Sequence, residues 1–107
     1  MKLNRISIIF CLLGLTMPSF GSNITGNTEF LKRNYEGAIE EYKETLSNDS
    51  TKSSSETYAL YRIGECYSYL NEAEEAVNYL NEAITSGYQE ADAYLIYGKN
   101  LQKLGKY

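Results

Sequence analysis

The sequence contains no histidine and no tryptophan, and it has only one proline and two cysteines among 107 residues. Without histidine, the chain lacks the usual general base near neutral pH and the commonest metal ligand of proteins. This absence weighs against most hydrolases and metalloenzymes, and no other nucleophile–base arrangement stands out. We therefore predict a non-enzymatic protein with no catalytic residues, no metal site and no cofactor.

The first segment of the chain has the layout of a secretory signal peptide. It reads MKLNRISIIFCLLGLTMPSFGS, with Lys2 and Arg5 before an apolar stretch at 6–15, and Ser19 and Gly21 after a proline. The apolar stretch is short for a membrane span. We predict a signal peptide at 1–21 and a secreted or periplasmic protein of a bacterium. The alternatives are an uncleaved anchor and a buried helix.

The chain that follows residue 21 is acidic, because all the acidic residues lie there and the whole chain already carries a formal charge of −4. Such a chain has no electrostatic surface for nucleic acid or for an anionic membrane. We predict no nucleic-acid partner and no membrane insertion after signal removal. One cysteine remains, Cys66, which cannot form an internal disulfide and is expected to be a small buried residue.

Two stretches of the chain repeat each other at a spacing of 34 residues. The first carries Leu60, Ile63, Gly64, Tyr67 and Leu70, which align with Tyr94, Tyr97, Gly98, Leu101 and Leu104. The stretches 34–46 and 72–84 also align, after a four-residue insertion in the polar loop at 47–55 is allowed for. Apolar residues in these stretches recur with a helical period. We predict helices at 34–48, 56–70, 73–86 and 90–105, and a short helix at 24–33.

These residues resemble the tetratricopeptide repeat, a helix–turn–helix unit with the motif W-x2-L-G-x2-Y followed by A-x3-F and a proline. The matching residues are Leu60, Ile63, Gly64, Tyr67, Ala76, Leu80 and Ala83, while Tyr88 stands in the proline place. The resemblance implies an all-α, right-handed helical-repeat solenoid of about two and a half units. A domain at 22–107 would then hold a partial unit at about 22–50, a full unit at about 57–88 and a half unit at about 91–107. The Sel-like repeat is the second choice and implies the same architecture.

Small residues of the repeat are expected to be packing positions. Gly64 and Gly98 would let the first helix of a unit approach a neighbouring helix closely. Ala38, Ala76 and Ala83 would do the same on the second helices. We expect none of these residues to take part in chemistry.

The opposite face of the first helices is the candidate binding site. In the family that the chain resembles, this stripe lines a concave groove that holds an extended peptide or a partner helix. The predicted groove residues are Tyr58, Tyr61, Glu65, Tyr69, Leu95, Lys99 and Gln102. The alternative for Tyr58, Tyr61 and Tyr69 is packing against the helices of the first unit. The family's basic clamp for carboxylates is not matched, because Tyr61 and Glu65 occupy its Lys and Asn places.

The last helix is predicted to expose an apolar edge, because no second helix of its unit follows in the sequence. The edge residues are Tyr94, Tyr97, Leu101 and Leu104. Either the chain is a piece of a longer array, or a second molecule covers the edge, for example in a homo-oligomer. The leading functional hypothesis is an exported scaffold that binds a peptide or protein partner. The alternative is a fragment or targeting module of a longer enzyme or assembly protein, which multimerises through this edge.

Overall fold

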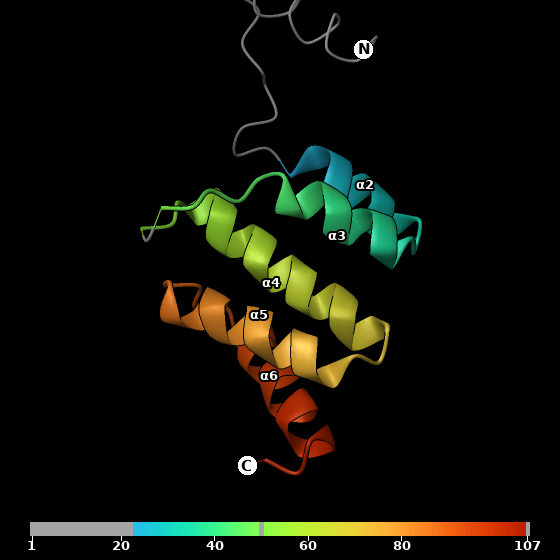
Figure 1. Ribbon diagram of the computed structural model, residues 1–107, viewed down its shortest axis with the longest axis vertical. Helices are drawn as coiled ribbons and strands as arrows, with labels where there is room; N and C mark the ends of the chain where they lie inside the picture. The colour runs from blue at the N-terminus through green and yellow to red at the C-terminus, as the bar shows by residue number, and fades with distance from the viewer. Residues whose placement is uncertain (1–22, 50, 107) are drawn as a thin grey trace, which may run out of the picture.

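The computed structural model describes residues 23–49 and 51–106, which form five α-helices and no strand (Figure 1). The helices are α2 (Ile24–Leu31), α3 (Tyr35–Lys43), α4 (Ser54–Tyr69), α5 (Ala73–Thr85) and α6 (Ala91–Lys103). The all-α prediction is confirmed, and each predicted helix is present. The largest difference in bounds is in α3, which ends at Lys43 rather than at residue 48. The predicted signal peptide at 1–21 lies outside the described residues.

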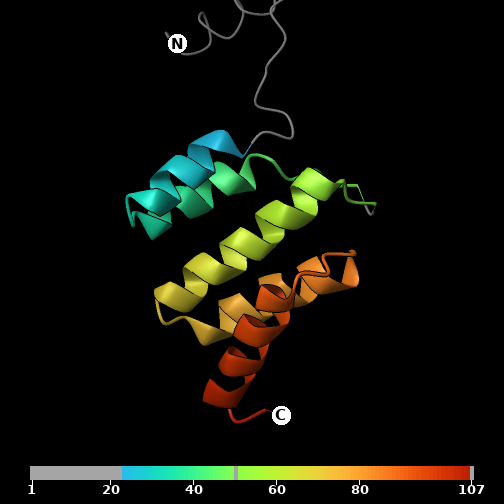
Figure 2. The same cartoon turned by 180° about the vertical axis from the view of Figure 1, so that it is seen from behind.

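Consecutive helices pack against each other along the chain, and α4 also contacts α6. The result is a stack in which α4 lies between the α2–α3 pair and the α5–α6 pair (Figure 1). In the view from behind, α6 lies in front of α5 (Figure 2). Among the described helices, none is long and apolar enough to cross a membrane.

Four of the helices end in the same way, with a residue in the left-handed backbone region. These residues are Arg33, Asn71, Gly87 and Gly105, with φ of 63°, 62°, 112° and 73°. After each of them, a backbone N–H donates to the carbonyl five residues earlier. The bond satisfies a carbonyl that the helix end would otherwise leave unpaired. After α2, α4 and α5 it also turns the chain into the next helix.

The start of α4 is fixed by a capping box between Ser53 and Glu56. The Glu56 backbone N–H donates to Ser53 Oγ at 3.2 Å, and the Ser53 N–H donates to Glu56 Oε1 at 2.9 Å. The other carboxylate oxygen of Glu56 accepts from the Ser47 N–H and hydroxyl at 2.7 and 2.6 Å. The hydrogen bonds from Ser47 and Ser53 lower the pKa of Glu56 to about 2. One carboxylate therefore ties the loop after α3 to the first turn of α4.

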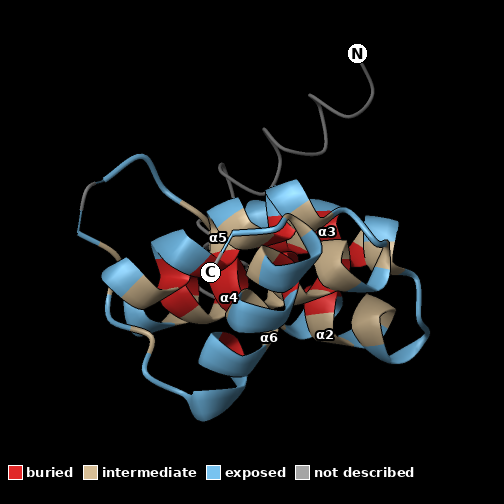
Figure 3. Cartoon of the chain, turned by 90° about the horizontal axis from the view of Figure 1, so that it is seen from below, coloured by how far each residue is buried: buried red, intermediate tan, exposed pale blue. Residues whose placement is uncertain are grey.

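Buried residues gather between the helices, and exposed residues lie around them (Figure 3). The core consists of two clusters that share α4. The first joins α3 to α4 and includes Tyr42, Ile63 and Cys66. The second joins α4 to α5 and α6 and includes Leu60 and Leu80. The predicted packing alanines at 38, 76 and 83 are all fully buried, as is Cys66, so these predictions are confirmed.

The two glycines of the repeat differ in their surroundings. A Cβ atom added to Gly64 would lie 2.6 Å from Leu80 Cγ on α5 and 3.2 Å from the Leu80 backbone nitrogen. Gly64 is therefore a close-contact position, as predicted. A Cβ atom added to Gly98 would meet nothing within 4 Å. The prediction was wrong for Gly98, because no described helix lies on that side of α6.

Candidate functional site

The predicted groove residues come from α4 and α6, and these two helices are joined directly. Asn100 Nδ2 donates to Ser68 Oγ at 3.0 Å, and Lys103 Nζ donates to Asn71 Oδ1 at 3.2 Å. Asn100 is completely buried. The two helices are thus neighbours, and we call the predicted groove side chains that they carry, without the buried Tyr61 and together with Arg62, the inner surface. Its members are the exposed and half-buried side chains of Tyr58, Arg62, Glu65, Tyr69, Leu95, Lys99 and Gln102.

Arg62 is at the centre of the α4 part of this surface, although it was not among the predicted groove residues. Its Nε donates to the Tyr58 hydroxyl at 2.8 Å, and its Nη1 donates to Glu65 Oε1 at 2.8 Å. The guanidinium lies 4.2 Å from the centroid of the Phe30 ring on α2. Burial works to lower the pKa of Arg62, but the hydrogen bonds with Tyr58 and Glu65 raise it above its usual range. Arg62 is therefore a fixed cation. Tyr58 lies four residues before Arg62 and Glu65 lies three residues after it, so the sequence already indicated that the three side chains are neighbours on one helix.

The Tyr58 hydroxyl extends this network to the first helix pair. It donates to Asn27 Oδ1 on α2 at 3.0 Å, and the Tyr42 hydroxyl donates to the same oxygen. The Tyr42 and Tyr58 rings meet edge to face with centroids 6.3 Å apart. Tyr58 therefore joins α2, α3 and α4, as the packing alternative for this residue predicted.

Tyr61 is a core residue, contrary to the prediction that it faces the groove. Its side chain is only 6% exposed. The ring stacks on that of Tyr88, with centroids 4.8 Å apart and planes 16° apart. Burial raises the pKa of Tyr61. The stack links α4 to the loop between α5 and α6, so Tyr61 positions α6 and offers almost no area to a partner.

Tyr69 has both of its predicted environments. It stacks on Tyr35 at the start of α3, with centroids 4.7 Å apart and planes 8° apart, and it meets the Phe30 ring edge to face. The side chain nevertheless remains 58% exposed. It is thus packed on one ring face and open elsewhere.

On α6 one predicted edge residue, Tyr94, lies beside the predicted groove residues. Leu95, Lys99 and Gln102 line one shallow pocket together with Tyr94 and Gly98. Leu95 is 58% exposed and Tyr94 is 50% exposed.

The other predicted edge residues are less open than expected. Leu101 and Leu104 are half-buried. Tyr97 is also half-buried and packs against the cluster formed by α4, α5 and α6, which corrects its assignment to an exposed edge. Only Tyr94 of the four is strongly exposed.

The side chains of this surface are suited to non-covalent contacts. They include tyrosine rings, the Arg62–Glu65 ion pair and the exposed Lys99. In the described part of the chain, no group of acidic, histidine or cysteine residues could hold a metal ion. Cys66 lies beneath the surface and is fully buried. Burial, followed by the nearby Glu65 carboxylate, raises the pKa of its thiol to about 12. The thiol is therefore held in its unreactive protonated form.

Stacked helix pairs with the first helices side by side define a helical-repeat protein. Residues 58–86, which span most of α4, all of α5 and the turn between them, match the family model of the tetratricopeptide repeat. The match agrees with the resemblance that the sequence indicated. Searches of curated proteins and of solved structures found no match. Such repeats are generally protein–protein interaction modules and are typically non-enzymatic scaffolds.

Proposed function

We propose that the chain is an exported, non-enzymatic scaffold that binds a peptide or protein partner on the inner surface of α4 and α6. The observation that carries the proposal is the fixed Arg62 cation, which lies between Tyr58 and Glu65 on a tetratricopeptide repeat. Its position is set within the protein, so little conformational entropy is lost when a partner binds. The wider arrangement in this proposal is a right-handed solenoid, in which α2–α3, α4–α5 and α6 are the partial, full and half units.

The chemistry of the surface defines the partner. Arg62 uses two of its five N–H groups for Tyr58 and Glu65, which leaves donors for a carbonyl or a carboxylate. Lys99 adds an exposed positive charge, and Leu95 adds an exposed apolar side chain. We expect a partner segment with an apolar anchor for Leu95 and an acidic or carbonyl-rich stretch along Arg62 and Lys99.

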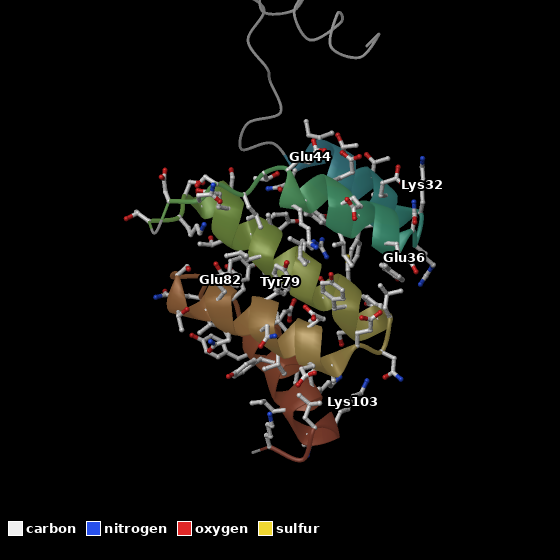
Figure 4. All side chains as sticks on the ribbon, viewed as in Figure 1. Lys32, Glu36, Glu44, Tyr79, Glu82 and Lys103 are labelled. Carbon is white, nitrogen blue, oxygen red and sulfur yellow. The ribbon has the colours of Figure 1, made fainter. Side chains whose placement is uncertain are left out.

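Variants on the two sides of the molecule test this proposal. The partner would be captured from the host's exported fraction with the wild-type chain and with the Arg62→Gln and Lys99→Glu variants, which each remove a positive charge of the inner surface. The matched control is Glu82→Lys, which also changes an exposed charge. Glu82 lies on α5 (Figure 4), whereas the inner surface belongs to α4 and α6. We expect both inner-surface variants to lose the partner and the control to keep it. Equal capture by all of these proteins, each shown to be folded by circular dichroism, would overturn the proposal.

Export is tested by the mass of the protein recovered from cells that express the full sequence. Cleavage after Gly21 is expected, so the recovered chain would begin at Ser22. Recovery of a chain that retains residues 1–21 would show that the segment is not a cleaved signal peptide. That result would leave the binding test above unaffected, so the two parts of the proposal can fail separately.

A further inference from the structure

The Arg62 cation of the inner surface is held by a side chain from outside the segment that matches the family model. Tyr58, whose hydroxyl accepts the Arg62 Nε–H at 2.8 Å, donates its own proton to Asn27 Oδ1 at 3.0 Å. Asn27 lies on α2, whereas the matched segment spans residues 58–86. The order of donors and acceptors is fixed, because a guanidinium can only donate and the Tyr58 hydroxyl has one proton. The direction of the guanidinium therefore depends on an oxygen of the first helix pair.

Asn27 is itself fixed by the close packing of α2 on α3 (Figure 1). A Cβ atom added to the preceding residue, Gly26, would lie 2.5 Å from Tyr42 Cδ1, so the α2 backbone touches the Tyr42 ring at this point. Gly26 and Tyr42 are both buried. The Tyr42 hydroxyl donates to Asn27 Oδ1 from the same ring. Asn27 Oδ1 thus accepts from two tyrosine hydroxyls, and only that of Tyr58 leads on to Arg62.

A second side chain of α2 supports the same cation. Phe30 lies three residues after Asn27, so the two side chains share a face of α2. The guanidinium carbon of Arg62 lies 4.2 Å from the centroid of the Phe30 ring. One residue of α2 therefore holds the Nε–H of Arg62 through Tyr58, and another lies against the guanidinium plane.

We propose that Asn27 is a positioning residue of the partner-binding site, which fixes the direction of the Arg62 guanidinium through the Tyr58 hydroxyl. The inference rests on the proposed function, because it assumes that Arg62 contacts the partner. A partner carbonyl or carboxylate meets the N–H groups that Tyr58 and Glu65 leave available, and such bonds depend on the angle at which the guanidinium is held. Without Asn27 Oδ1, the Tyr58 hydroxyl can rotate and the bond to Nε loses its single geometry. The binding site then depends on α2 as well as on α4 and α6.

Proton exchange at Arg62 Nε tests the positioning role without any partner. The rate of exchange with water is measured by proton–nitrogen NMR on the protein recovered from cells that express the full sequence. The Arg62 signal is the one that Arg62→Gln removes, and Arg33 supplies the rate of an exposed side chain. Asn27→Leu keeps the size of the side chain but accepts no hydrogen bond, so we expect exchange at Arg62 to become about tenfold faster, the factor that one net hydrogen bond represents. Asn27→Asp keeps an acceptor and should retain the slow exchange.

Tyr42→Phe is the matched control. It removes a hydroxyl that is bonded to the same oxygen, but it leaves Tyr58 bonded to Asn27, so exchange at Arg62 should stay at the wild-type rate. An unchanged rate in Asn27→Leu, with the fold retained by circular dichroism, overturns the proposal. Equal acceleration in Tyr42→Phe also overturns it, because the effect would then come from a general loosening of α2. If Asn27→Leu does not fold, Asn27→Ala removes the acceptor in its place and is judged in the same way.

Capture of the partner shows whether the positioning matters for binding. We expect Asn27→Leu to weaken capture, as Arg62→Gln does, and Tyr42→Phe to leave it unchanged. If Arg62→Gln loses the partner and Asn27→Leu keeps all of it, this inference is overturned and the proposed function stands. Capture that Arg62→Gln leaves unchanged overturns the proposed function, and this inference with it.

Discussion

Alanine at the two equivalent glycines is expected to change the stability of the fold in opposite directions. Gly98→Ala adds a methyl group in open space, so the main effect is the better helix propensity of alanine, about 1 kcal/mol of added stability. Gly64→Ala gains the same propensity but places its methyl carbon 2.6 Å from Leu80 Cγ.

The crowding at Gly64 has no simple relief. Leu80 is completely buried, and its backbone nitrogen would lie 3.2 Å from the new carbon, so a rotation of the side chain does not remove the contact. Overpacking of this kind costs about 2 kcal/mol. After about 1 kcal/mol of propensity is subtracted, we expect Gly64→Ala to lose about 1 kcal/mol. The free energies of unfolding of the two variants should therefore differ by about 2 kcal/mol.

Urea denaturation followed by far-ultraviolet circular dichroism measures this difference. A third variant identifies the cause. Leu80→Ala should be less destabilising when Gly64→Ala is already present, because the smaller side chain removes the crowding. If the two alanine variants are stabilised equally, or if Leu80→Ala costs the same in both backgrounds, close packing does not explain Gly64.

Three further changes probe other parts of the structure. Hydrogen bonds from Ser47 and Ser53 lower the pKa of Glu56 from 4.5 to about 2, so the carboxylate stabilises the fold fully above pH 4.5 and loses this effect as the pH falls towards 2. Glu56→Gln should therefore flatten the pH dependence of the urea midpoint between pH 4.5 and 2. An unchanged pH dependence in this variant would contradict the role of Glu56. Cys66 should react with a thiol reagent only as fast as the chain unfolds, and rapid labelling without denaturant would show that the thiol is not buried. Tyr61→Ala should lower the free energy of unfolding, measured by urea denaturation, by about 3 kcal/mol because the buried ring and its stack on Tyr88 are lost. A decrease below about 1 kcal/mol would show that Tyr61 is not a core residue.

The sequence predicted the helices well because their signals are local. The apolar period and the 34-residue spacing located α4, α5 and α6, and the match at 58–86 confirmed the repeat. The end of α3 was placed too late, because a polar stretch that starts at Ser47 says little about the last turn of a helix before it.

The site was harder to predict, because a helical period tells which face a residue shares but not what covers that face. Tyr61 was placed on the groove side, yet Tyr88 reaches it from a loop that the period does not describe. Gly98 aligned with Gly64, but only Gly64 has a helix against it. Arg62 was overlooked because a charge on a helix flank is usually solvated, and its contact with Phe30 depends on how α2 packs.

The inner surface is the central claim, and photo-crosslinking in the host is the most direct measurement of it. A photoreactive side chain would be placed at Leu95, which is exposed on α6, and at Glu82, which is exposed on α5. We expect a crosslinked partner from position 95 and none from position 82, and the same partner should disappear when Arg62→Gln is added. Crosslinks from position 82 alone, or crosslinks from position 95 that Arg62→Gln does not change, would contradict binding on the inner surface.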